Sequence, residues 1–276
     1  MNSVLRQTPT TAVPWLHDLD DRNRVLFGVA AAHLILFLGM LVVAPFDPRS
    51  VTGINPWIKP MKFALSIAIY TATIAWFLGY LPITLRAKQS VSWGIAIAML
   101  VEMALIVIQA ARGVPSHFNE TSPFNAAVFA AMGVMIVGNT ALAAYVTWQF
   151  YRTQPALPAP FLWGIRLGLT VFVLASLEGF AMVGRMSHAV GVADGGPGLP
   201  FVNWSTEGGD LRIAHFIGLH ALQVIPFIGY LMSRPGLTAR LAHRVMWLWV
   251  FAMGYAAVSL LLFLQALLGH PLLRMA

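Results

Sequence analysis

Residues 25–44 read VLFGVAAAHLILFLGMLVVA, and this stretch decides the class of fold. It carries no charged residue and has the roughly 20 apolar residues that a helix needs to cross the hydrocarbon layer of a bilayer. Within lipid, every backbone amide must be bonded inside the protein, which leaves helices and closed barrels. Barrel strands alternate in hydrophobicity over about ten residues, whereas this run is unbroken. The stretch therefore predicts a membrane-spanning helix.

Further runs of the same kind follow, separated by segments rich in proline, glycine and charge. The predicted spans cover residues 25–44, 62–83, 91–111, 126–150, 161–184, 213–232 and 245–267. The composition agrees, because 58% of the residues are hydrophobic and only 10% are charged, against about 25% charged residues in soluble domains. The sequence thus predicts an all-α, multi-pass membrane bundle of about seven transmembrane helices.

The spans group into a single domain, the bundle of residues 25–267. Residues 1–24 are expected to form a cytoplasmic N-terminal arm, since they lack the apolar run and cleavage site of a signal peptide. Residues 268–276 form a short C-terminal tail. The longest connections, residues 112–125 and 185–212, fall on one side of the bundle and contain the proline and glycine clusters of turns.

The charge pattern favours a membrane rather than a nucleic acid as the partner. The net charge is +7, but lysines and arginines flank spans for topological reasons, and no basic tract is interleaved with aromatic residues. Slightly more of them fall on the side of the N-terminus, which is then the cytoplasmic side. We expect an integral protein of the bacterial cytoplasmic (inner) membrane with its N-terminus inside.

Polar residues within the spans gather near the predicted outer face. At about 100° per residue, Glu102 and Gln109 lie within roughly 20° of each other on one helix, as do Glu178 and Arg185 on another. A charge facing lipid at mid-depth costs about 3 kcal/mol, so such polar stripes should face one another. The candidate site is built on Glu102, Glu178, His215 and His220, with a second tier of Lys62, Arg112, His117, Arg185, His188, Asp210, Arg212 and Gln223.

The leading hypothesis is redox chemistry linked to a haem, a transition metal or a quinone. In it Glu102 and Glu178 handle protons, while His215 and His220 act as metal ligands, since imidazole binds haem iron and, with carboxylates, zinc or iron. The five-residue spacing of the two histidines is not a metal signature, and HExxH is absent. The quinone variant needs no metal, because His and Glu side chains can exchange protons with the ligand directly.

Other functions stay open. In a proton-coupled small-solute transporter, the glutamates and histidines would form a relay, although their clustering in one half of the membrane does not favour alternating access. An interfacial hydrolase or transferase could use Ser116 with His117, or Ser205 and Thr206 with Asp210, but no nucleophile motif frames them. In a structural subunit of a membrane complex, the same polar residues would only join helices.

Overall fold

The structure, a computed structural model, describes residues 14–235 and 240–274. Within these residues, seven helices are long and apolar enough to cross a membrane, which confirms the predicted multi-pass helix bundle and indicates an integral membrane protein. These helices are α2 (Arg24–Val43, extended by the short helix η1, Ala44–Phe46), α3 (Ile58–Tyr80), α4 (Leu85–Arg112), α5 (Pro123–Arg152), α6 (Ala159–Leu177) with α7 (Gly179–Arg185), α8 (Leu211–Met232) and α9 (Leu241–Leu267).

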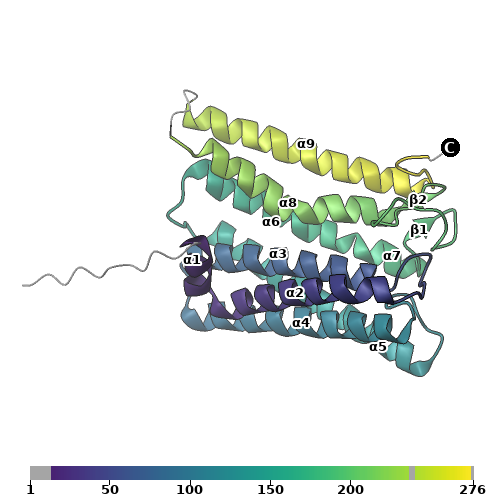
Figure 1. Ribbon diagram of the computed structural model, residues 1–276. Helices are drawn as coiled ribbons and strands as arrows, with labels where there is room; N and C mark the ends of the chain where they lie inside the picture. Colours follow the sequence, from purple (N-terminus) through teal and green to yellow (C-terminus); the bar gives the residue numbers. More distant parts are fainter. Residues whose placement is uncertain (1–13, 236–239, 275–276) are drawn as a thin grey trace, which may run out of the picture.

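The long helices lie side by side, so that the connections fall at two ends (Figure 1). One end, called the loop end below, is formed by residues 44–57, 113–122, 178–210 and 268–274, and it includes α7 and the paired strands β1 (Ala189–Val190) and β2 (Gly209–Asp210). The opposite end carries the short helix α1 (Pro14–Arg22). The predicted long connections thus share one end, away from the start of α2; which side of a membrane that end faces stays a prediction.

Several helices begin earlier than their apolar runs. Helix α3 starts at Ile58 rather than 62, because Pro60 is tolerated in a first turn, where its missing N–H would be unpaired anyway. Helices α4 and α5 start at the caps Thr84 and Ser122, whose side chains accept bonds from backbone N–H groups. The polar first turns therefore belong to the helices, although they do not belong to the apolar runs.

The predicted span 161–184 is interrupted where it meets the loop end. Helix α6 ends at Leu177, Glu178 caps it, and α7 continues from Gly179. Helix α7 ends at Arg185, and the next residue, Met186, adopts the left-handed conformation. The break places Glu178 at a junction between helices rather than within one.

The packed core lies mainly in the half nearer the opposite end, where large side chains such as Leu26, Leu78, Ile95 and Phe150 are fully buried. Close approach of α6 and α8 depends on small residues, as is common in membrane bundles. A Cβ atom on Gly229 would lie 2.5 Å from the carbonyl oxygen of Pro160. Outward faces are apolar and exposed, which suits contact with a lipid bilayer.

Candidate functional site

The connection 113–122 places His117 against buried Glu102. Glu102 lies ten residues before the end of α4, about 15 Å along the helix, and is 3% exposed. The His117 Nε2 atom is 3.7 Å from Glu102 Oε1. The imidazole packs between Phe63 of α3 and Phe129 of α5, with ring centroids 5.8 and 6.3 Å away. The connection therefore folds inward between the helices.

Hydrogen bonds within the connection hold this inward turn. The Ser116 hydroxyl lies 3.0 Å from His117 Nδ1, and the Asn119 amide donates to the carbonyl of Pro115. Ser116 and Asn119 are both buried. Phe118, between them, has a φ of 55°, a conformation that is rare for a bulky residue. Local bonding thus fixes the position of the His117 ring.

A second histidine–carboxylate pair forms in residues 186–210. His188 Nδ1 lies 2.8 Å from Asp194 Oδ2, and Asp194 also accepts bonds from the Ser187 hydroxyl and from the backbone N–H groups of His188 and Ala189. These donors hold the pKa of Asp194 well below its usual range, although burial opposes them. An ionised carboxylate can only accept, so His188 Nδ1 carries the hydrogen and Nε2 is left as an acceptor.

The ring of Phe118 joins the two pairs. Its centroid is 6.1 Å from the His117 ring and 4.8 Å from the His188 ring. Burial lowers the pKa of both histidines, and the charge of Lys59 lowers each further, while the bond to Asp194 partly offsets this for His188. Both imidazoles are therefore neutral at neutral pH, and each has a nitrogen that can accept a proton.

Lys59, in the first turn of α3, was missed by the sequence analysis. It lies within electrostatic range of Glu102, Asp194, Arg212 and Lys62, yet it makes no hydrogen bond to any residue that the structure describes. The available signal was its spacing: Lys59 and Lys62 are three residues apart and so share a face of one helix. It was overlooked because a lysine at a span end has an ordinary topological explanation.

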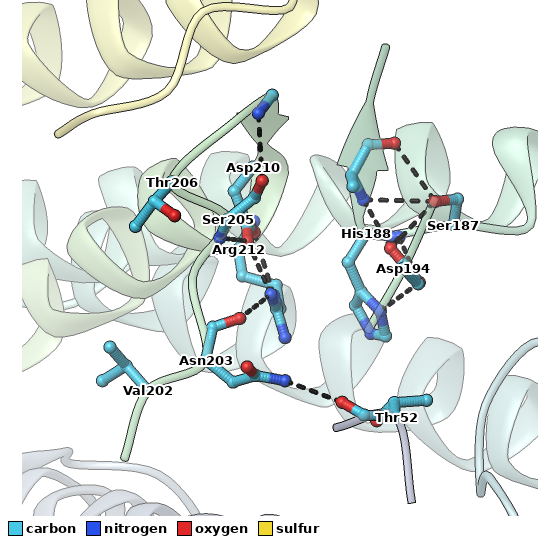
Figure 2. A network of polar contacts seen from close by, with 12 residues as sticks. Thr52, Ser187, His188, Asp194, Val202, Asn203, Ser205, Thr206, Asp210 and Arg212 are labelled. Atoms are coloured by element: carbon cyan, nitrogen blue, oxygen red, sulfur yellow. Dashed lines mark hydrogen bonds and ion pairs between the residues drawn. The ribbon is translucent and has the colours of Figure 1, made fainter. Parts of the chain in front are cut away.

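Asp210 and Arg212 form a clamp at the start of α8 (Figure 2). Asp210 is fully buried and accepts from the Arg212 guanidinium at 2.5 Å and from the backbone N–H of Ser205 at 2.8 Å. Arg212 also donates to the carbonyl of Asn203, whose side chain donates to the carbonyl of Thr52. In Figure 2 the Arg212 guanidinium and the His188 ring point toward the same side, where Thr52 lies.

The other predicted core residues have separate surroundings. His215 Nδ1 donates to the carbonyl of Ala175, 2.9 Å away, beside the break at Glu178, whose Oε2 is buried without a partner among the described residues. His215 is within electrostatic range of His188. His220 instead bonds to the carbonyl of Phe216 in its own helix. His215 and His220 therefore bond to different carbonyls, one in a neighbouring helix and one in their own.

Most second-tier residues connect elements. Arg112 donates to Gln109 and Asn125, joining α4 to α5, and Lys62 donates to the carbonyl of Val202. Gln223 donates to Thr73, joining α8 to α3. Arg185 is exposed and has no partner within residues 14–235 and 240–274.

The structure does not arrange the described residues of the predicted metal site and of the predicted nucleophile sets for those roles. Among the described residues, no group of three His, Asp or Glu side chains could hold a metal ion. The hydroxyl of Ser205 accepts from the N–H groups of Glu207 and Gly208, and that of Thr206 donates to the carbonyl of Pro197. Both hydroxyls therefore serve the local turn.

Comparison with protein-family models, curated proteins and solved structures found no match. We call the following six residues the headgroup cluster: Lys59, Glu102, His117, Phe118, His188 and Asp194. The cluster combines a cation without a hydrogen bond, proton-accepting groups and an aromatic ring, drawn from α3, α4 and two connections.

Proposed function

We propose that the headgroup cluster binds the ring of a quinone, the lipid-soluble carrier of electrons and protons, and exchanges a proton with it at Glu102 and His117. The observation that carries the proposal is the state of Glu102. Its Oε2 atom is buried and has no hydrogen-bond partner in the described part of the chain. A buried polar atom of this kind calls for an explanation, and Glu102 differs from the other two such residues of the described chain, His33 and Glu178, in having a histidine and the charge of a lysine beside it.

The groups around Glu102 complement a quinone ring. The Lys59 ammonium can donate to one ring oxygen, whether that oxygen is a carbonyl or a hydroxyl. The Glu102 carboxylate can accept from a hydroxyl of the reduced form, with His117 within reach to share the proton. The phenyl rings of Phe63, Phe118 and Phe129 surround His117 and supply faces on which a flat ring can stack.

The distribution of polar groups favours such a one-sided site over a transport path. The half nearer the opposite end is filled by large apolar side chains, and its few buried polar groups are isolated or paired, as in the bond from Tyr70 to Asn139. An alternating-access carrier needs polar groups reachable from both sides. A lipid-soluble ligand needs only one.

Binding of a short-chain benzoquinone to the purified protein tests the proposal, with quenching of tryptophan fluorescence as the readout. Lys59→Met is expected to weaken binding of the benzoquinone about tenfold or more, and Glu102→Gln is expected to weaken binding of its hydroquinone, kept reduced under anaerobic conditions, to the same degree, since a hydrogen bond to a charged group contributes about 1.5–3 kcal/mol. Glu120→Gln is the matched control, because Glu120 is exposed in the same connection as His117. A folded wild-type protein that binds neither form, or unchanged binding of both forms by both variants, would refute the proposal.

The orientation belongs to the same proposal: the loop end faces away from the cytoplasm of a bacterial cell. The chain has no cysteine, so single cysteines can report topology without a background. In intact cells a membrane-impermeant thiol reagent should label Glu120→Cys at the loop end and should not label Arg86→Cys at the opposite end. The reverse pattern would overturn the orientation and leave the site unaffected.

A further inference from the structure

The second histidine of the cluster has a different chemical state from the first. The ring of His188 is fixed by Asp194, which is itself held by three other donors. Because the carboxylate takes the Nδ1 hydrogen, neutral His188 presents only a lone pair, on Nε2, to whatever lies beyond it. It can accept a hydrogen bond from a hydroxyl group but cannot donate one to a carbonyl.

The position of His188 would allow it to contact the same ligand as Glu102. Both His117, which touches Glu102, and His188 contact the ring of Phe118. A benzoquinone carries its two oxygens at opposite ends of a six-membered ring, so a ring stacked on Phe118 can reach a polar group at each end. Lys59 lies within electrostatic range of both histidines.

We propose, building on the proposed function, that His188 selects the reduced form of the ligand, the hydroquinone, by accepting a hydrogen bond from its second hydroxyl group. The oxidised form has a carbonyl at this position, and two facing lone pairs repel each other. Sites built to bond a hydroxyl group reject analogues that lack it, because the buried acceptor is then left unpaired. Asp194 acts as a positioning residue through the tautomer that it fixes.

Protonation of His188 should reverse this preference. With a hydrogen on Nε2, the ring becomes a donor and suits the carbonyl of the oxidised form. The titratable and charged groups that face His188 are Asp194 from its own connection, Lys59 from α3, Arg212 and His215 from α8, and His117 from the connection 113–122. Burial and the two cations lower the pKa of His188, so the neutral form dominates at neutral pH.

The test compares the dissociation constants of a short-chain benzoquinone and of its hydroquinone, the latter kept reduced under anaerobic conditions. The wild-type protein is expected to bind the hydroquinone about tenfold more tightly at pH 7.5, the size of effect of one hydrogen bond that a buried group would otherwise lack, and less selectively at pH 5. His188→Leu should remove both the preference and its pH dependence. His188→Gln should bind both forms at either pH, since an amide both donates and accepts.

The controls separate this inference from the function on which it rests. His243→Leu changes an exposed histidine at the opposite end and should leave the preference intact. Failure of the wild-type protein to bind either form would overturn the quinone site and this inference together. Binding of both forms with a ratio that is the same in wild type, His188→Leu and His188→Gln would overturn only the role of His188. If His188→Leu does not fold, the pH dependence of His188→Gln decides the question.

Discussion

Arg166, near the opposite end, and the pair Lys59 and Glu102, toward the loop end, differ in how their charged side chains are hydrogen-bonded. Near the opposite end, Arg166 is 6% exposed, and its guanidinium donates to the carbonyls of Phe150 and Thr153 and lies over the ring of Trp163. At the loop end, Lys59 and Glu102 lie within electrostatic range of each other but share no hydrogen bond in the described chain. Arg166 therefore has its donors paired within the protein, whereas the Lys59 ammonium and the Glu102 Oε2 atom have no hydrogen-bond partner among the described residues.

Backbone strain follows the same division. In the part of the chain that the structure describes, the residues other than glycine with positive φ all lie at the loop end: Thr52, Phe118, Met186, Phe201 and Asn203. The left-handed conformation costs such residues about 1–2 kcal/mol each. Strain and unpaired polar groups in one region are typical of sites shaped for binding rather than for stability.

The largest effect is expected at the clamp of Asp210 and Arg212, because there the loop end does contain a buried ion pair with its hydrogen bonds made. Asp210→Ala removes the N-cap of α8 and leaves the Arg212 guanidinium without its carboxylate. Breaking a buried pair from one side costs about 3–5 kcal/mol, so we expect a loss of that order in the free energy of unfolding, measured by denaturant titration in detergent.

Asp18→Ala is the matched control for the clamp. Asp18 and Arg22 also form a carboxylate–guanidinium pair, at 2.9 Å, but it is partly open to solvent and lies on α1 at the opposite end. Exposed pairs four residues apart on a helix contribute about 0.3–0.5 kcal/mol. Equal losses in the two variants would show that Asp210 is not the anchor of the loop end.

A smaller but more discriminating effect is expected when Arg166→Met and Glu102→Gln are compared in both stability and ligand binding. Arg166→Met leaves two backbone carbonyls without their donor and should destabilise the protein by about 2–3 kcal/mol, with benzoquinone binding unchanged. Glu102→Gln should leave the stability equal or higher, because it removes a buried carboxylate, and should weaken binding of the hydroquinone. If each of the two variants lost both stability and binding, the proposed difference between Arg166 and Glu102 would be wrong.

The fold was predictable because lipid imposes a simple rule on the sequence. Runs such as 25–44 must be helical when no water is present to bond the backbone, so the number of spans followed from hydropathy. The starts of helices were less predictable, since Ile58 and Leu85 begin their helices through a proline in the first turn and a threonine cap rather than through hydrophobicity. The break at Glu178 was not predicted, although the glycine that follows it, Gly179, is a residue that weakens helices.

The candidate site was predictable only in its location. Periodicity placed Glu102 on an inward stripe, but the contact with His117 depends on how the connection 113–122 folds inward, which bonds such as that of Asn119 to Pro115 determine. The two loop histidines were therefore ranked below His215 and His220, which the structure keeps apart. Spacing along one helix cannot reveal which loop side chains reach its buried face.

The smallest effect should appear in the pH dependence of stability, where two half-buried histidines of the loop end are compared with an exposed one. The pKa values of His117 and His188 are lowered in the folded protein, so the unfolded chain binds protons first as the pH falls below about 6.5. Their contribution to stability is present above that pH and is lost as the pH falls toward the lowered values, at a rate of at most roughly 1.4 kcal/mol per pH unit for each histidine. The temperature of thermal unfolding should therefore fall in the wild type as the pH is lowered from 7.5 to 5, and this fall should be smaller in the double variant His117→Gln, His188→Gln.

Asp194 stays ionised throughout this window, because its pKa is held below the usual 3.8. The exposed His243 serves as the reference, since His243→Gln should leave the shift unchanged; an equal reduction in that variant would mean that the loop end holds no special pair of histidines.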